Sequence, residues 1–154
     1  KSGTLFEASA LGMHPGTRED ILACFRERGV RCTSQRFAIL EHLAHHPDHP
    51  TAEQIHEAIN RADPRASLAT VYKALHAMAD AGLIRELQLG GNAARFEAVT
   101  GRHHHFLCER CGGMEDIEWF EVPELLKKRA AGRRVVRDCE VILRGLLPPA
   151  RATK

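Results

Sequence analysis

The chain has 154 residues, a formal net charge of +2 and an apolar fraction of 44%. These values suit one or two small globular domains with a buried core. The small positive charge permits nucleic-acid binding only if lysines and arginines cluster on one face. Ten histidines, three of them consecutive, are a first sign of metal chemistry.

The cysteine pattern and the hydropathy of the chain indicate its cellular compartment. The five cysteines contain one close pair, which is not the pattern of a secreted disulfide framework. No apolar run approaches the roughly 20 residues that cross a bilayer. Residues 1–12 lack the features of a signal peptide, and Met13 is a candidate native start. We therefore expect a soluble, cytoplasmic protein.

Apolar residues at helical spacing predict four helices in the first part of the chain. The first covers residues 17–28 and stops at Gly29, and the second begins at Thr33 or Ser34. Residues 45–50 form a break, after which a third helix starts at Thr51 and ends at Asp63-Pro64. The fourth helix runs from Ser67 to Gly82.

After residue 82 the apolar period changes from helical to two. Residues 83–89 and 94–99 are predicted strands joined by a turn at 90–92. Helices followed by a hairpin are typical of a winged helix-turn-helix. Beyond a boundary at Thr100-Gly101, we predict strands at 105–108 and 114–119, a helix at 122–131 and a strand at 135–143.

The predicted fold class is α+β, an N-terminal winged helix-turn-helix domain followed by a small α/β dimerisation domain. Residues 13–100 form the DNA-binding domain, 101–147 the dimerisation and metal-sensing domain, and 148–154 a polar tail. The second domain is too small to bury much core alone, which favours a homodimer.

The helix from Ser67 carries a polar face that could enter the major groove of DNA. Thr70, Tyr72 and Lys73 can reach phosphates and base edges from such a helix. The plainer alternative is that this face is the solvated side of an amphipathic helix. Further possible phosphate contacts come from basic and polar residues nearby, namely Arg31, Gln35, Arg36, Arg85 and Arg95.

The histidine triplet is the most specific chemical signal. On a strand, His103 and His105 point the same way and His104 points opposite, so two imidazoles can converge on one metal ion. Glu97 and Asp116 could add carboxylate oxygens, a donor set that suits iron, manganese or zinc. The alternative is an exposed polyhistidine run that binds metal adventitiously.

Cys108 and Cys111 form a Cys-x-x-Cys turn followed by two glycines. This spacing is typical of half a zinc knuckle, but a structural zinc site wants about four ligands. A pair of buried thiols and a redox couple are the alternatives. We therefore expect an incomplete structural zinc site at most.

Together these segments resemble the ferric uptake regulator (Fur) family. The resemblance runs from about Thr17 to Gly145, and its matching stretches are Arg31–Arg36, His49–Glu53, Ser67–Leu75, Gly82–Ile84, Arg95–Glu97 and His103–Gly112. It implies a homodimeric repressor that binds a palindromic double-stranded operator. It also implies that a divalent metal (Fe²⁺, Mn²⁺ or Zn²⁺) at the interdomain hinge gates that binding. The family's regulatory ligands fall on Glu97, His103, His105 and Asp116.

The resemblance has departures. Asp116 is similar to the peroxide-sensing branch, yet Phe37 stands where that branch has a histidine. Either another group, such as His42 or water, completes the site, or the hinge is coupled differently. Leu147 and Ala150 replace a second cysteine pair. An additional family metal site would fall on Arg102, His104 and Cys139, and Arg102 cannot be a ligand. Haem among residues 103–105 is an alternative that we disfavour.

The sequence leaves two classes of function to be weighed. The first is a metal-gated DNA-binding repressor, and the second is an enzyme, either a zinc hydrolase or a Cys-x-x-Cys oxidoreductase. The chain shows no substrate-binding signature, and Cys108 does not begin a helix in a βαβ unit. We therefore expect a regulator that is not an enzyme.

Overall fold

The computed structural model describes residues 16–61, 66–88, 93–98, 101–122 and 140–148. Its contacts divide the chain into two units, Lys1–Gly101 and Arg102–Lys154, and each unit is considered by itself. Among the described residues, no helix combines the length and apolar character needed to cross a membrane.

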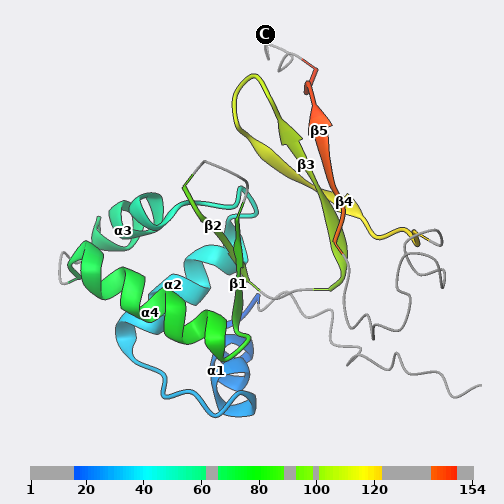
Figure 1. Cartoon of the computed structure of the whole chain (residues 1–154). Helices are drawn as coiled ribbons and strands as arrows, with labels where there is room; N and C mark the ends of the chain where they lie inside the picture. Colours follow the sequence, from blue (N-terminus) through cyan, green and yellow to red (C-terminus); the bar gives the residue numbers. More distant parts are fainter. Residues whose placement is uncertain (1–15, 62–65, 89–92, 99–100, 123–139, 149–154) are drawn as a thin grey trace, which may run out of the picture. The chain divides into compact units, whose positions relative to one another are not determined.

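Four helices make up most of the first unit (Figure 1). They are α1 (Arg18–Glu27), α2 (Ser34–His45), α3 (Ala52–Asn60) and α4 (Leu68–Asp80). Each begins directly after a hydroxyl side chain that accepts a hydrogen bond from the third backbone N–H of its helix. These N-caps are Thr17, Thr33, Thr51 and Ser67.

The helices pack on a short antiparallel hairpin formed by β1 (Ile84–Leu87) and β2 (Arg95–Ala98). Gly82, at a positive φ of 70° that favours glycine, ends α4 and turns the chain into β1. The buried core joins all six elements through Ile21, Phe25, Ile39, Leu40, Ile55, Val71, Leu75, Met78, Ile84 and Phe96. The predicted winged helix-turn-helix is thus confirmed.

The connection between α2 and α3 is bonded to strand β2. The backbone N–H of Phe96 donates to the Pro50 carbonyl at 3.0 Å, and Thr51 forms a β-bridge with Arg95. The Arg95 guanidinium also donates to the His49 carbonyl at 2.9 Å. These bonds hold His49 at a positive φ of 50°, which non-glycine residues seldom adopt.

The second unit contains a three-stranded sheet with β3 (His103–Cys108) in the centre. Strand β4 (Met114–Glu118) pairs with it antiparallel, and β5 (Ile142–Gly145) pairs with it parallel (Figure 1). Leu107, Cys108 and Met114 are buried.

Some predicted boundaries in this unit were wrong. Strand β3 starts at His103, two residues before the predicted start, because β4 pairs along its whole length as far as Glu118. Strand β5 continues to Gly145, beyond the predicted end, because parallel pairing with β3 sets its extent. Most of the predicted helix 122–131 and the first part of the predicted strand 135–143 lie outside the described residues.

His104 is fully buried on one face of β3 and serves the packing of this unit. Its Nε2–H donates to the Phe120 carbonyl at 2.8 Å, and its Nδ1 accepts from the backbone N–H of Val141 at 3.2 Å. The rings of Trp119 and Phe120 lie 4.5 and 4.3 Å from its centroid. Both ring nitrogens are therefore used by backbone groups, so His104 has no lone pair left for a metal ion.

We expect His104→Ala to lower the free energy of unfolding of the second unit by about 3 kcal/mol, because it leaves a cavity and two unpaired backbone groups. Trp119 is the single tryptophan of the chain and lies against His104, so its fluorescence during urea unfolding reports on this unit. The measurement is made with a chelator present. Exposed Glu115→Ala on β4 is the control and should leave the transition in place. An unchanged midpoint for His104→Ala would refute this role.

Candidate metal centre and nucleic-acid interface

In the first unit, the buried carboxylate of Glu97 is paired on both of its oxygens. His49 Nε2 lies 3.0 Å from Oε2, and Arg85 Nε lies 3.1 Å from Oε1. Only 2% of His49 and 8% of Glu97 are exposed. Arg85 stands directly opposite Glu97 in the hairpin register, so the pairing follows from the strands themselves. A buried carboxylate requires such partners because burial removes it from water.

In the second unit, two imidazoles and one carboxylate converge. His103 and His105 lie on the same face of β3, with their Nε2 atoms 3.1 Å apart. Asp116, opposite His105 in β4, places Oδ1 at 3.6 and 3.7 Å from these two nitrogens. Two nitrogens bound to one ion at about 2.1 Å would themselves be roughly 3 Å apart. The three donors therefore fit a single divalent cation.

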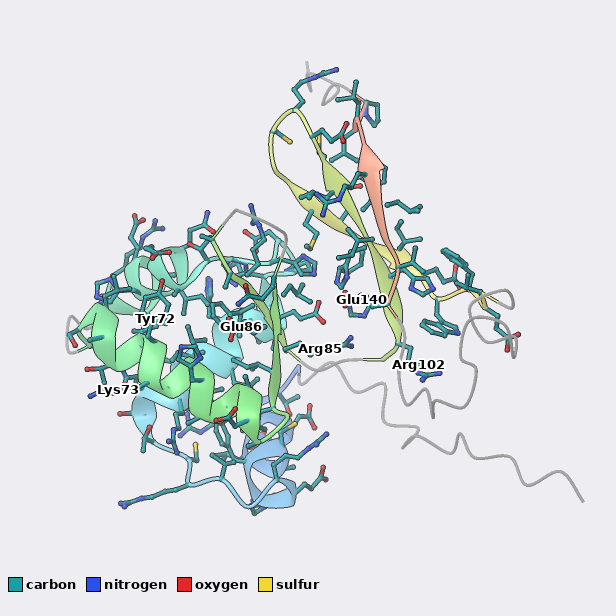
Figure 2. The ribbon with its side chains drawn as sticks, in the orientation of Figure 1. Tyr72, Lys73, Arg85, Glu86, Arg102 and Glu140 are labelled. Carbon is teal, nitrogen blue, oxygen red and sulfur yellow. The ribbon has the colours of Figure 1, made fainter. Side chains whose placement is uncertain are left out.

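Glu140 is a participant that the sequence did not reveal. Its carboxylate pairs with Nδ1 of His105, the ring nitrogen that faces away from His103 (Figure 2). A carboxylate on Nδ1 fixes a histidine with its Nε2 lone pair free for a metal. The parallel pairing of β5 with β3 brings Glu140 to this position, and no spacing rule in the sequence indicates that pairing.

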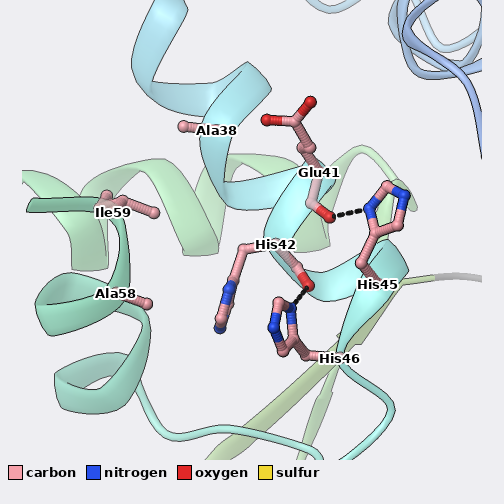
Figure 3. Close-up of a pocket in the computed structure, with 7 residues that line it drawn as sticks. All are labelled: Ala38, Glu41, His42, His45, His46, Ala58 and Ile59. Carbon is pink, nitrogen blue, oxygen red and sulfur yellow. Dashed lines mark hydrogen bonds between the residues drawn. The ribbon is translucent and has the colours of Figure 1, made fainter. Parts of the chain in front are cut away.

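His49 is the other residue that sequence reasoning missed. Phe37 packs against the helical core under the Arg18 guanidinium, 4.7 Å away, and offers no ligand. His42 stacks on His46 at the C-terminal end of α2 (Figure 3). The imidazole beside Glu97 is that of His49, which was not among the ligands predicted from the sequence. The signal was present, since His49 opens one of the segments that resemble the family.

Cys108 and Cys111 lie at the turn between β3 and β4 as free thiols, the first buried and the second exposed. Backbone N–H groups of Leu147, Cys111 and Arg110 lower the pKa of the Cys108 thiol to about 7. Within the described part of the second unit, these are the only two thiols, and Cys139 lies outside it. The residues present do not fit a four-thiolate zinc site.

The additional family metal site finds no support in the described residues. The Arg102 guanidinium stacks over the Trp119 ring at 4.8 Å, and the ring nitrogens of His104 are bonded to backbone groups. Cys139 lies outside the described residues.

The candidate DNA-contacting face of α4 is solvent-exposed at Thr70 and Lys73. Tyr72 is half-buried, and its hydroxyl donates to the Glu53 carboxylate of α3 at 2.8 Å (Figure 2). That hydrogen bond raises the pKa of Tyr72 and lowers the pKa of Glu53. Lys73 is therefore the cation of this face that is presented to solvent.

The remaining candidate contacts differ in accessibility. Arg31 is exposed, and Arg36 is half-buried with its Nη1 donating to the Arg31 carbonyl at 3.0 Å. The amide nitrogen of Gln35 is buried and has no hydrogen-bond partner among the described residues. Arg85 pairs with the Glu97 carboxylate, and Arg95 donates to the His49 carbonyl.

Comparison with known proteins agrees with this architecture. Residues 27–143 match the ferric uptake regulator family. The chain is 38% identical over 107 residues to the peroxide-responsive repressor PerR of Staphylococcus aureus, covering 70% of this chain and 72% of that protein. This supports a place near the peroxide-sensing branch.

Solved structures give the same result. The ferric uptake regulator of Vibrio cholerae has a TM-score of 0.66 at 27% identity, covering 81% of this chain and 98% of that one. The Pseudomonas aeruginosa regulator, solved with manganese, has a TM-score of 0.63 at 27% identity, covering 82% and 96%. These relatives are regulators, so the enzyme hypotheses do not hold. The chain belongs to the ferric uptake regulator family of metal-responsive transcriptional regulators.

Proposed function

We propose that the chain is a cytoplasmic repressor that binds a palindromic double-stranded operator as a homodimer, gated by a divalent cation at the hinge. Its ligands are Glu97, His103, His105 and Asp116, together with His49. The observation that carries the proposal is that each unit holds a preformed cluster of nitrogen and carboxylate donors.

The covalent link between the units makes a shared ion feasible. Glu97 and His103 are separated by five residues, and an extended chain of that length spans at most about 20 Å. The first unit can therefore bring His49 and Glu97 to the ion that His103, His105 and Asp116 bind. A cation held by both units would restrict the angle between the DNA-binding unit and the dimerisation unit of each chain.

The donor chemistry selects the class of metal. Three imidazoles and two carboxylates suit Fe²⁺, Mn²⁺ or Zn²⁺, and the set contains no thiolate. The manganese-bound P. aeruginosa relative is consistent with this choice. Haem is disfavoured because His105 is fully buried and paired with Glu140, and His104 is fully buried and bonded to backbone groups.

The residues act by shifting a population of conformers. A bound ion would supply positive charge to the carboxylates of Glu97 and Asp116. Arg85 orients Glu97, and Glu140 orients His105, so the donors need little rearrangement. Binding the closed arrangement more tightly than the open one shifts the equilibrium toward the DNA-competent dimer. Half-sites one helical turn apart then fit both α4 helices at once.

We expect His105→Ala and His49→Ala each to abolish the stimulation of operator binding by Mn²⁺ while leaving metal-free binding unchanged. Each variant removes one donor from a different unit, so the pair tests whether one ion uses both. Fluorescence anisotropy with a Fur-type palindrome, with Mn²⁺ and with chelator, measures the effect. His45→Ala, an exposed histidine of α2, is the matched control. Full stimulation in His49→Ala would exclude His49 as a ligand, and full stimulation in His105→Ala would overturn the ligand set.

We expect Glu140 to favour metal binding by orienting the His105 ring. Two substitutions of Glu140 can separate this effect from the effect of its negative charge. Glu140→Ala should weaken Mn²⁺ binding by about 10- to 100-fold, the usual cost of losing a group that orients a ligand. Glu140→Gln keeps an oxygen that can accept from Nδ1–H, so its loss should be smaller. Electron paramagnetic resonance of free Mn²⁺ gives both affinities. Equal losses for the two variants would show that charge, not orientation, is the contribution of Glu140.

Lys73→Ala should weaken operator binding and reduce the slope of log affinity against log salt by about two, because each protomer of the dimer loses one phosphate contact. Metal content and dimerisation should be unchanged, as sedimentation and metal analysis can show. Tyr72→Phe should weaken binding less, since its hydroxyl is engaged by Glu53. A Lys73→Ala protein with the wild-type salt slope would place α4 outside the DNA interface.

A further inference from the structure

A second histidine cluster lies at the C-terminal end of α2, apart from the donors described above. His42, His45 and His46 line a pocket of about 380 Å³ between α2 and α3 (Figure 3). Its remaining lining is Glu41 and three apolar residues, Ala38, Ala58 and Ile59. We propose that His42 and His46 bind a borderline divalent transition-metal ion of the nickel, copper and zinc group in this pocket.

His42 lies in the last turn of α2, and His46 is the residue directly after its end. Residues four apart are neighbours along a helix surface. The ring centroids of His42 and His46 are 4.2 Å apart, and the rings are inclined by 27°. Two imidazoles held side by side over one pocket can each direct a nitrogen to the same ion.

Hydrogen bonding decides which nitrogen of His46 is available. Its Nδ1 lies 2.8 Å from the His42 carbonyl oxygen, which can only accept. Nδ1 therefore carries the proton, and Nε2 keeps its lone pair. Metal-binding histidines commonly have this arrangement, in which a carbonyl accepts a hydrogen bond from the ring nitrogen that does not bind the metal.

His42 is available for a different reason. Neither of its ring nitrogens has a hydrogen-bond partner within the described part of the chain. Burial, followed by the nearby His46, lowers the pKa of His42, which keeps the ring neutral at physiological pH. The charge of Asp48 acts in the opposite direction and raises this pKa.

The surroundings allow an ion with an incomplete protein shell. The pocket has room for several waters, which would fill the positions that two imidazoles leave open. Arg61 is the nearby cation, and its guanidinium is paired with Glu57 at 3.0 Å. Imidazole donors favour nickel, copper and zinc over magnesium or calcium.

The test is a Ni²⁺ titration of the full-length chain followed by amide and imidazole NMR. The chain carries His103→Ala and His105→Ala, which removes two of the three imidazole ligands of the hinge. We expect perturbation of residues 42–48 and of Ala58 and Ile59. On this background, His42→Ala and His46→Ala should each weaken binding by at least about tenfold.

His45→Ala is the matched control, because His45 has the same bond from Nδ1 to a backbone carbonyl, at 2.8 Å from Glu41, but is not a proposed ligand. Its affinity for Ni²⁺ should be unchanged. The proposal is overturned if Ni²⁺ leaves residues 42–48 unperturbed. It is equally overturned if the perturbation survives both ligand substitutions, or if His45→Ala weakens binding as much as they do.

Discussion

The burial of the Glu97 carboxylate is the constraint on which the first unit's donor cluster depends. A buried charge must be paired, and the hairpin supplies Arg85 from the opposite strand while the α2–α3 connection supplies His49. His49 pairs with Glu97 from a left-handed backbone conformation, which Arg95 and the Pro50–Phe96 bond hold. The β1–β2 hairpin therefore supports this cluster and is also part of the winged helix-turn-helix.

The three consecutive histidines have two different roles, because neighbouring side chains on a strand point to opposite faces of the sheet. His103 and His105 share one face of β3 with Asp116, while His104 lies among Trp119, Phe120 and the backbone of Val141. An exposed polyhistidine run would leave all three rings in solvent. Burial of His104 and His105 excludes that alternative and makes the triplet part of the sheet.

Local signals explain what the sequence could predict. The helices of the first unit were foreseeable because hydroxyl caps and apolar spacing are features of neighbouring residues, and strand alternation placed His103 and His105 together. Glu140 and the extent of β5 were not foreseeable, because they depend on parallel pairing with β3. His49 was missed because a single left-handed residue, which has no periodicity, directs it toward Glu97.

The four hydroxyl caps of the first unit have a consequence for the order of folding during synthesis. Each helix start is capped by a residue of its own segment, so those contacts need no residue from a later part of the chain. The central strand β3 must instead wait for β5, which follows all of β4 and residues 119–141. Non-local pairing of this kind is slow, and N-terminal units commonly fold first. The helical first unit can thus be folded while the sheet that carries His105 still lacks strand β5.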